Sequence, residues 1–303
     1  MSKHIFALVV LALSYSFLYA CDACSCTSMN SLDGQVLPNK QSFIGWSTSY
    51  IHQTNSEQSK INNISNSLFG AFKFSKSWQI LAALPLQQNY LKEKEASWSS
   101  QVGLGDASVV LGYSPIFKKS MLKDYQQSLI LRAGLKVPTG YYHVDNTSNA
   151  NFGTKSFDFL LSAQYVYQKN NQGINLSVNS RINTKNKYAY KYGSRIDVSA
   201  FYFVQRTKNT LAYMPFFGAS GEYNLKDTSN GFIREFSGGG AMYGITGFLL
   251  NFNSKFSLYS KIELPLVQNF SGINGPIYNT VKAQIQGVYF FNNKIISKKT
   301  KSE

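Results

Sequence analysis

The chain has 303 residues, a formal net charge of +15 and a mean hydropathy of −0.19, with 20 Tyr, 22 Phe and 22 Gly but only 7 Pro. Aromatic residues suit β-strands, and runs of the helix formers Ala, Glu and Leu are scarce, so a helical fold is excluded. The Lys and Arg residues are spread along the chain instead of forming one basic run, which argues against a nucleic-acid partner.

The N-terminus carries an export signal. Lys3 and His4 lead into an apolar run from Ile5 to Leu13 that continues to Ala20. This pattern predicts a secretory signal peptide over residues 1–20, and the run is too short for a membrane-spanning helix of roughly 20 residues. The mature chain is therefore expected to leave the cytoplasm.

The three cysteines of the chain follow directly, in the stretch LYACDACSC. Leu18-Tyr19-Ala20-Cys21 resembles a lipobox, which makes Cys21 a candidate lipidation site. An oxidising compartment would instead favour a disulfide between Cys21 and Cys24. The cluster of Cys21, Cys24 and Cys26 could also hold a soft metal ion such as Cu(I) through thiolates. All three readings stay open for the polar N-terminal segment 21–41.

Hydrophobic periodicity sets the fold class. In INLSVNSRIN, residues 174–183, apolar residues alternate with polar ones, so one face is apolar and the other is wet. The same alternation recurs around residues 157–168 and 281–289. It predicts strands near residues 42–53, 65–75, 77–89, 104–117, 126–138, 155–168, 172–184, 195–206, 210–224, 238–251, 255–267 and 280–291. Each of these twelve is long enough to cross a tilted bilayer, for which roughly 9–11 residues suffice.

The connections alternate in length. Short polar turns are expected at residues 75–77, 169–172, 205–210 and 251–255, an intermediate one at 117–126, and longer loops at 53–65, 89–103, 139–154, 184–195, 224–238 and 268–280. Short turns on one side and long loops on the other, with an even strand number, are typical of a bacterial outer-membrane barrel. Only a closed barrel or a helix pairs every backbone group in lipid. The sequence therefore predicts an all-β transmembrane antiparallel barrel over residues 42–291, followed by a basic tail at 292–303.

Three stretches carry a family resemblance: GLGDASVVLGYSP (103–115), LRAGLKVPTGYY (131–142) and NFGTKSFDFLLSAQYVY (151–167). In this order and spacing they resemble the outer-membrane barrels grouped as a putative MetA pathway of phenol degradation. The resemblance covers roughly residues 40–290, with Lys155 standing where that family usually has glycine. It implies an uptake or efflux barrel in the Gram-negative outer membrane without naming a solute.

The wet faces of the strands predict the lining of the lumen. The candidate pore-lining residues are Arg132, Lys136, Asp158, Arg181, Arg195, Asp197, Lys261, Glu263 and Lys282, with Lys255 and Asp106 on the same faces. Their excess is basic, which favours anionic or polar solutes. Alternatively the charges pair with one another and plug a barrel that twelve strands can nearly fill. Phe201, Phe203, Val288 and Phe290 also point inward, which suits an amphipathic or aromatic solute.

An enzymatic role finds little support. A twelve-stranded outer-membrane phospholipase uses a His-x-Ser-Asn stretch, and the nearest match here is His52-Gln53-Thr54-Asn55, with His143 in no better context. We therefore expect no enzyme and no cofactor, but a channel or transporter that contacts membrane lipid and lipopolysaccharide. The alternatives are copper-type metal handling through the cysteine cluster and, less favoured, lipid hydrolysis.

Overall fold

The computed structural model describes residues 41–55, 60–92, 99–120, 125–141, 151–208, 211–252, 255–272 and 275–291. The predicted signal peptide, the three cysteines and the basic tail lie outside these residues. No helix in the described ranges is long and apolar enough to cross a membrane.

The barrel wall is built in chain order. Its strands are β1 (Ser42–Asn55), β2 (Lys60–Lys73), β3 (Trp78–Lys92), β4 (Ser99–Leu104), β5 (Ser108–Ser120), β6 (Tyr125–Lys136), β7 (Asp158–Lys169), β8 (Gln172–Ile182), β10 (Arg195–Val204), β11 (Arg206–Lys208), β12 (Leu211–Asn224), β15 (Gly239–Asn251), β16 (Phe256–Gly272) and β17 (Gly275–Phe291). Three short strands, β9 (Tyr190–Lys191), β13 (Thr228–Ser229) and β14 (Phe232–Ile233), form a separate sheet.

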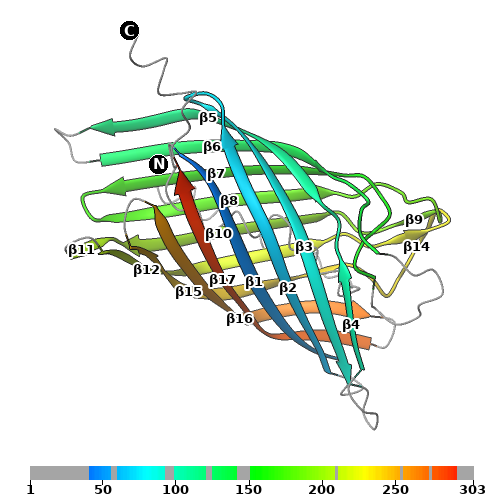
Figure 1. Cartoon of the computed structure of the whole chain (residues 1–303). Helices are drawn as coiled ribbons and strands as arrows, with labels where there is room; N and C mark the ends of the chain where they lie inside the picture. Colours follow the sequence, from blue (N-terminus) through cyan, green and yellow to red (C-terminus); the bar gives the residue numbers. More distant parts are fainter. Residues whose placement is uncertain are drawn as a thin grey trace, which may run out of the picture.

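The wall closes on itself. Each strand pairs antiparallel with its neighbours, and β1 pairs with β17 from Ser42 opposite Phe291 to Asn55 opposite Ile277. Because β4 continues into β5 and β11 continues β10, both along shared partners, the described strands make a closed twelve-stranded barrel. The predicted fold class is confirmed. Figure 1 shows β17, β1, β2 and β3 crossing the front of this barrel, and β9 and β14 at its right-hand end.

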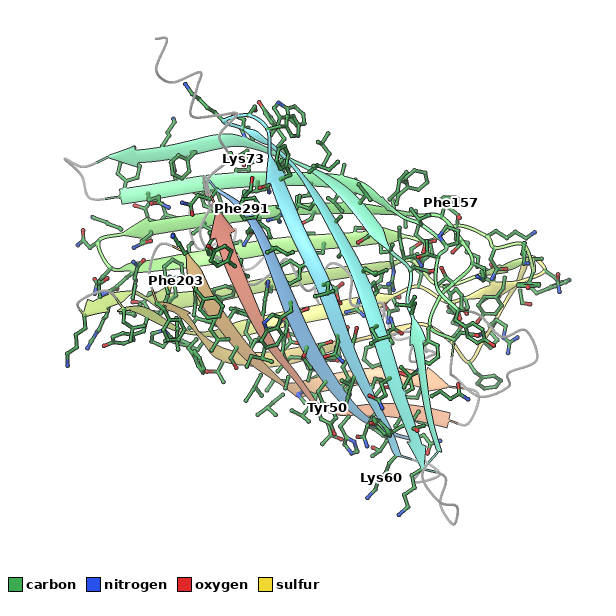
Figure 2. All side chains as sticks on the ribbon, viewed as in Figure 1. Tyr50, Lys60, Lys73, Phe157, Phe203 and Phe291 are labelled. Carbon is green, nitrogen blue, oxygen red and sulfur yellow. The ribbon has the colours of Figure 1, made fainter. Side chains whose placement is uncertain are left out.

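Side chains alternate across the wall as the sequence predicts. In β8 the outward Leu176 and Val178 are each 43% exposed, whereas Asn175 between β7 and β10 is 1% exposed and faces the lumen. The outward set is apolar around the barrel, which is the surface that lipid requires. Side chains stand on both faces of the ribbon in Figure 2, with Phe203 and Phe291 toward the short-turn end and Phe157 toward the long-loop end.

Three predicted long loops are wrong. Residues 89–103 were expected to be a loop, but β3 runs to Lys92 and β4 starts at Ser99. Residues 53–65 were expected to be a loop, but β1 runs to Asn55 and β2 starts at Lys60. Residues 268–280 were also expected to be a loop, but β16 runs to Gly272 and β17 starts at Gly275. Residues 53–65 and 268–280 are rich in Asn, Ser and Gln, which suit turns, yet here they extend the strands and bury the inward side chains of Ile61, Phe270 and Ile277. The long connections at 137–157, 183–194 and 225–238 agree with the prediction.

Prolines inside the wall coincide with irregular pairing. Pro85 of β3 lies opposite the break between β4 and β5, Pro115 lies at the register shift in β5, and Pro265 of β16 lies at the shift opposite Met242 and Tyr243. Proline cannot donate a ladder hydrogen bond, so a strand tolerates it best at a bulge. These positions let an aromatic-rich wall carry prolines without leaving neighbouring carbonyls unpaired.

The outward face gives a first prediction. Leu176→Arg should destabilise the folded barrel by about 2–4 kcal/mol, because it places a charge on the lipid-facing side of a central stretch of β8. Urea unfolding of protein reconstituted in lipid vesicles measures this cost. Thr207→Arg, which replaces an exposed side chain of the short strand β11 at the rim of the barrel, is the control and should change stability by less than about 0.5 kcal/mol. Equal stability of both variants would show that Leu176 does not face lipid.

Candidate functional site: the lumen of the barrel

The candidate pore-lining residues all lie on inward-facing positions, but they divide into two groups. Arg132, Lys136 and Asp158 gather on β6 and β7, and Arg132 donates a 3.1 Å hydrogen bond to Gln164 Oε1. The other group lies on β8, β10, β16 and β17 and comprises Arg181, Arg195, Asp197, Lys261, Glu263 and Lys282. Lys255, by contrast, is exposed in the turn between β15 and β16.

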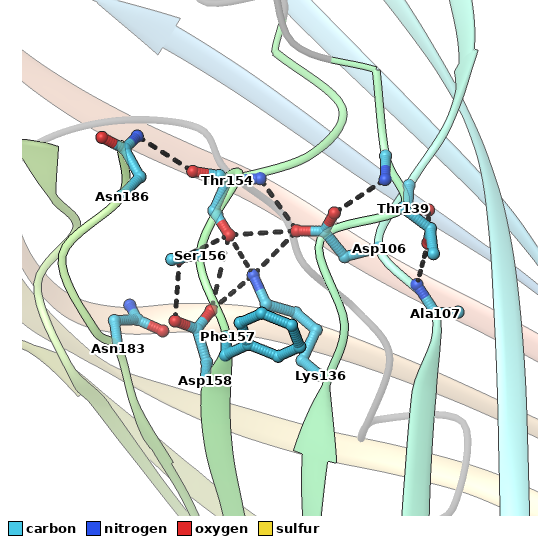
Figure 3. Close-up of polar contacts among 12 residues, drawn as sticks. Asp106, Ala107, Lys136, Thr139, Thr154, Ser156, Phe157, Asp158, Asn183 and Asn186 are labelled. Atoms are coloured by element: carbon cyan, nitrogen blue, oxygen red, sulfur yellow. Dashed lines mark hydrogen bonds and ion pairs between the residues drawn. The ribbon is translucent and has the colours of Figure 1, made fainter. Parts of the chain in front are cut away.

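The first group is a buried ion cluster around Lys136. The Lys136 ammonium lies 2.9 Å from Asp106 Oδ2 and 2.5 Å from Asp158 Oδ2, and all three side chains are no more than 1% exposed. Lys136 also donates to Thr154 Oγ1, while Ser156 donates to Asp158 Oδ1 at 2.9 Å. Figure 3 shows these side chains converging from β6, β7 and the loop before β7. Removal of one partner would leave an uncompensated buried charge.

A bulge between β4 and β5 directs the Asp106 side chain toward Lys136. Residues 105–107 separate β4 from β5 while both strands pair with β3, and Gly105 N donates to Pro85 O at 2.9 Å. Asp106 then accepts bonds from Gly140 N and Thr154 N, each at 2.8 Å. The three sequence stretches that carry the family resemblance therefore meet at one place. Their contacts fix residues 139–141 and 152–156 onto the barrel.

Lys155 keeps a glycine-like backbone in this loop. Its φ is 54°, in the left-handed region where a residue with a Cβ is uncommon. The bonds of Thr154 and Ser156 on either side hold the peptide in place. Lys155 therefore adopts a backbone conformation that glycine reaches without a steric cost.

The second group forms a charged layer across the lumen, defined here as Arg195, Asp197, Glu222, Lys261, Glu263 and Lys282. Arg195 contacts Asp197 and Glu222 at 2.6 Å each, Lys282 contacts Glu222 at 2.5 Å, and Lys261 contacts Glu263 at 2.9 Å. Three cations thus meet three carboxylates. They line a cavity of about 30 Å³, so the described side chains leave little free space at this level.

Sequence reasoning missed Glu222 and Tyr243. Glu222 accepts from Lys282 and from the hydroxyl of Tyr243, which in turn accepts a 2.7 Å bond from Asn279 Nδ2. Glu222 shares the inward face of β12 with Phe216 and Ser220, so the period-two pattern of that strand was the available signal. With Glu222 included, the six residues of the layer balance, and Arg181, in register with Arg195, leaves the second group with one excess positive charge.

An apolar collar lies between the charged layer and the short-turn end of the barrel. It consists of two clusters of inward side chains: Phe43, Phe69, Ala71, Leu81, Ala83, Val110, Leu160, Val288 and Phe290; and Val166, Phe201, Phe203, Met214, Phe216, Ile245, Leu249 and Tyr259. The four inward residues expected from sequence, Phe201, Phe203, Val288 and Phe290, all belong to it. Phe216 lies between Phe201, 4.7 Å away between ring centroids, and Tyr259, 5.5 Å away.

Glycines let the collar rings lie against the wall. A Cβ at Gly173 would lie 2.4 Å from the Phe203 ring, and one at Gly247 would lie 2.5 Å from the Phe216 ring. Backbone oxygens lie as close, with Tyr167 O 2.5 Å from the first Cβ position and Ser260 O 2.1 Å from the second, so a larger residue would strain the wall as well as the ring. Glycine at these two positions therefore lets the Phe203 and Phe216 rings lie close to the barrel wall.

Polar groups are buried at the collar. Asn175 lies in register with Val166 on one side and Phe201 on the other, and neither its amide nitrogen nor its amide oxygen has a hydrogen-bond partner among the described residues. The hydroxyl of Ser128, which is in register with Val166, also lacks one there. A buried amide without partners carries a desolvation cost of about 1–3 kcal/mol. A hydrogen-bonding solute at this level would offset that cost.

His52, His143 and the three cysteines are the residues considered for an enzymatic or metal-binding role. His52 lies in β1, three residues before its end, where its Nδ1 is 2.6 Å from Asn62 Oδ1 and the Tyr50 hydroxyl donates to the same oxygen at 2.9 Å. His143 and the three cysteines lie outside the described residues. Within the described ranges, no group of three or more His, Cys, Asp or Glu residues is placed to hold a metal ion.

The closed wall, the apolar outer face and the polar lumen define a transmembrane β-barrel of the bacterial outer membrane. A family model described as "Putative MetA-pathway of phenol degradation" matches residues 52–261. The chain belongs to this family, as the sequence resemblance predicts.

One solved structure shares the fold. An outer membrane channel from Pseudomonas putida F1 has a TM-score of 0.64 at 10% identity, over 84% of this chain and 97% of that one. The β domain of the Bordetella autotransporter BrkA has a TM-score of 0.47 at 11% identity, over 83% of this chain and 100% of that one. No curated protein matches this chain.

The ion cluster gives a second prediction. Lys136→Met should lower the free energy of unfolding by about 3–5 kcal/mol, because Asp106 and Asp158 would then remain buried without their cation. Thermal unfolding followed by electrophoretic mobility measures the loss.

Lys169→Met, which removes an exposed lysine at the far end of β7, is the matched control and should be neutral. A triple variant that adds Asp106→Asn and Asp158→Asn should recover part of the loss, because no unpaired charge remains. If Lys136→Met were as stable as the control, the cluster would not hold the loop.

Proposed function

We propose that the barrel is an outer-membrane channel for small amphipathic solutes, aromatic compounds among them. The observation that carries the proposal is the order of the lumen, in which a charge-balanced layer lies above an apolar, ring-lined collar. A solute with a polar group and a ring would find partners for both parts along one path. The channel from Pseudomonas putida F1, which shares the fold, and the family description support this role.

The collar favours rings over chains of polar groups. Phe201, Phe216 and Tyr259 offer stacked and tilted faces, and aromatic pairs are worth about 0.5–1.5 kcal/mol beyond the area they bury. The amide of Asn175, in register with Phe201, offers two N–H donors and one acceptor oxygen at the same level. A hydroxyl or carbonyl on an aromatic ring matches this combination better than a plain hydrocarbon does.

The charged layer favours no ion of either sign strongly. Arg195, Lys261 and Lys282 are each within 3 Å of a carboxylate, so their field is largely cancelled inside the lumen. This balance replaces the anion preference expected from the sequence with weak ion selectivity. The paired side chains also narrow the path, so conduction depends on their rearrangement.

Glu222→Gln tests this balance. The substitution leaves the cations of the charged layer with one carboxylate fewer, so the channel should become anion-selective. The shift of the reversal potential in a salt gradient across a planar bilayer measures it. Glu235→Gln, on an exposed loop residue, is the control and should leave the reversal potential unchanged. A cation-selective Glu222→Gln channel would contradict the proposed layer.

Phe216→Ala tests the collar. Truncation of this inward ring, which is 2% exposed, should raise the single-channel conductance and the uptake of 4-hydroxybenzoate into proteoliposomes. Its sequence neighbour provides the control, because Phe217 is 63% exposed on the outer face and Phe217→Ala should alter neither quantity. Heat-dependent electrophoretic mobility verifies that both variants are folded. Unchanged conductance and uptake in folded Phe216→Ala would show that the collar does not lie on the solute path.

A further inference from the structure

The loops at the long-loop end build a small rigid surface, here named the loop platform and defined as residues 185–191 and 225–236. Its core is the hairpin of β13 and β14, joined by Asn230 and Gly231 with φ values of 52° and 87°. Two residues with positive φ at a two-residue turn are the signature of a tight hairpin. β9 pairs with the other side of β13 and completes the sheet.

Hydrogen bonds fix the loop platform to the barrel. The buried Asp227 carboxylate accepts from Gly193 N at 2.6 Å and from the Tyr190 hydroxyl, and its own backbone N donates to Ser237 Oγ at 2.8 Å. Asn186 donates through Nδ2 to Thr154 O at 3.0 Å, which links the platform to the ion cluster of Lys136. The surface is therefore held in one arrangement by the same anchors that order the other long loop.

This ordered surface presents large apolar side chains to its surroundings. Phe232 is 78% exposed, Phe236 is 64% exposed and Ile233 is 61% exposed. These three residues lie within five positions of one hairpin, and large exposed apolar patches mark interaction sites. They continue the outward apolar residues Tyr223 and Leu225 at the end of β12, so the platform adjoins the lipid-facing wall.

The loop platform also carries exposed cations beside these apolar groups in the sequence. Lys185, Lys187, Lys191 and Arg234 are all exposed, and the Lys187 ammonium lies 4.9 Å from the centre of the Tyr188 ring. Of the acidic residues in the platform, Asp227 is buried in its hydrogen bonds and Glu235 contacts Lys226 at 2.5 Å. The surface thus offers several cations as well as apolar groups and little opposing charge.

We infer that the loop platform binds a phosphorylated glycolipid of the outer leaflet, that is, lipopolysaccharide. Its phosphates would contact Lys187, Lys191 and Arg234, while Phe232, Ile233 and Phe236 enter the acyl region beside the wall. Basic residues near a membrane surface attract anionic head groups, and amphipathic surfaces bind lipid through both terms. This surface does not depend on the lumen, so the inference is independent of the proposed transport.

The test uses the full-length folded protein in neutral detergent and diphosphoryl lipid A as the probe. A triple variant, Lys187→Gln with Lys191→Gln and Arg234→Gln, should raise the apparent Kd by at least about tenfold. Each of the three cations is expected to contribute to the binding of the lipid phosphates. Removal of both phosphates from the lipid should weaken binding to the wild type to a similar degree. A Phe232→Ser and Phe236→Ser variant should also bind less tightly.

The control removes three exposed cations at the opposite end through Lys118→Gln, Arg206→Gln and Lys208→Gln, and should keep wild-type affinity. Single-channel conductance should be unchanged in every variant, which separates this surface from the lumen. Wild-type affinity in the platform variant, or equal binding of the dephosphorylated lipid, would overturn the inference.

Discussion

The pairing of β1 with β17 is the constraint on which the rest of the structure depends. Fourteen residues of β1, from Ser42 to Asn55, find partners along β17, so the two ends of the barrel sequence meet in one seam. In lipid, every unpaired backbone group on an open edge would cost several kcal/mol, and closure removes both edges at once. The seam also brings Phe43 and Phe290 together, 6.0 Å apart between ring centroids, so the apolar collar continues across it.

Closure with twelve strands fixes the room inside, and side-chain size then decides what the interior can do. A barrel of this size is narrow enough for side chains to reach one another across the lumen. Lys282 of β17 thus contacts Glu222 of β12, although β15 and β16 lie between these strands. The sequence leaves two alternatives open, a lined pore and a plug of paired charges. Both would be built from these side chains, and single-channel conductance distinguishes them.

The sequence predicted the wall better than the interior. The alternation in β7 and β8 is regular because lipid on one side and a polar lumen on the other impose a period of two. The extended rims of β1, β2, β16 and β17 escaped prediction because polar Asn, Ser and Gln in them suit loops as well as strands above the membrane. The inward position of Glu222 could be predicted from the alternating pattern of β12, but its contacts with Arg195 and Lys282 could not. Contacts such as that between Lys136 and Asp158 depend on strand register and on a bulge, and local pattern encodes neither fully.

The break at residues 105–107 also determines where the chain can tolerate an insertion or a deletion. A one-residue deletion inside β5 would exchange its faces and turn the lipid-facing Val109, Leu111 and Tyr113 toward the lumen. At the break itself the ladder of hydrogen bonds is already interrupted, so the same deletion would not exchange the faces of the strand. It would, however, move Asp106 away from Lys136. Insertions and deletions among related barrels should therefore collect at such irregular points and in the loops, and be rare within the uninterrupted ladders of β7 and β8.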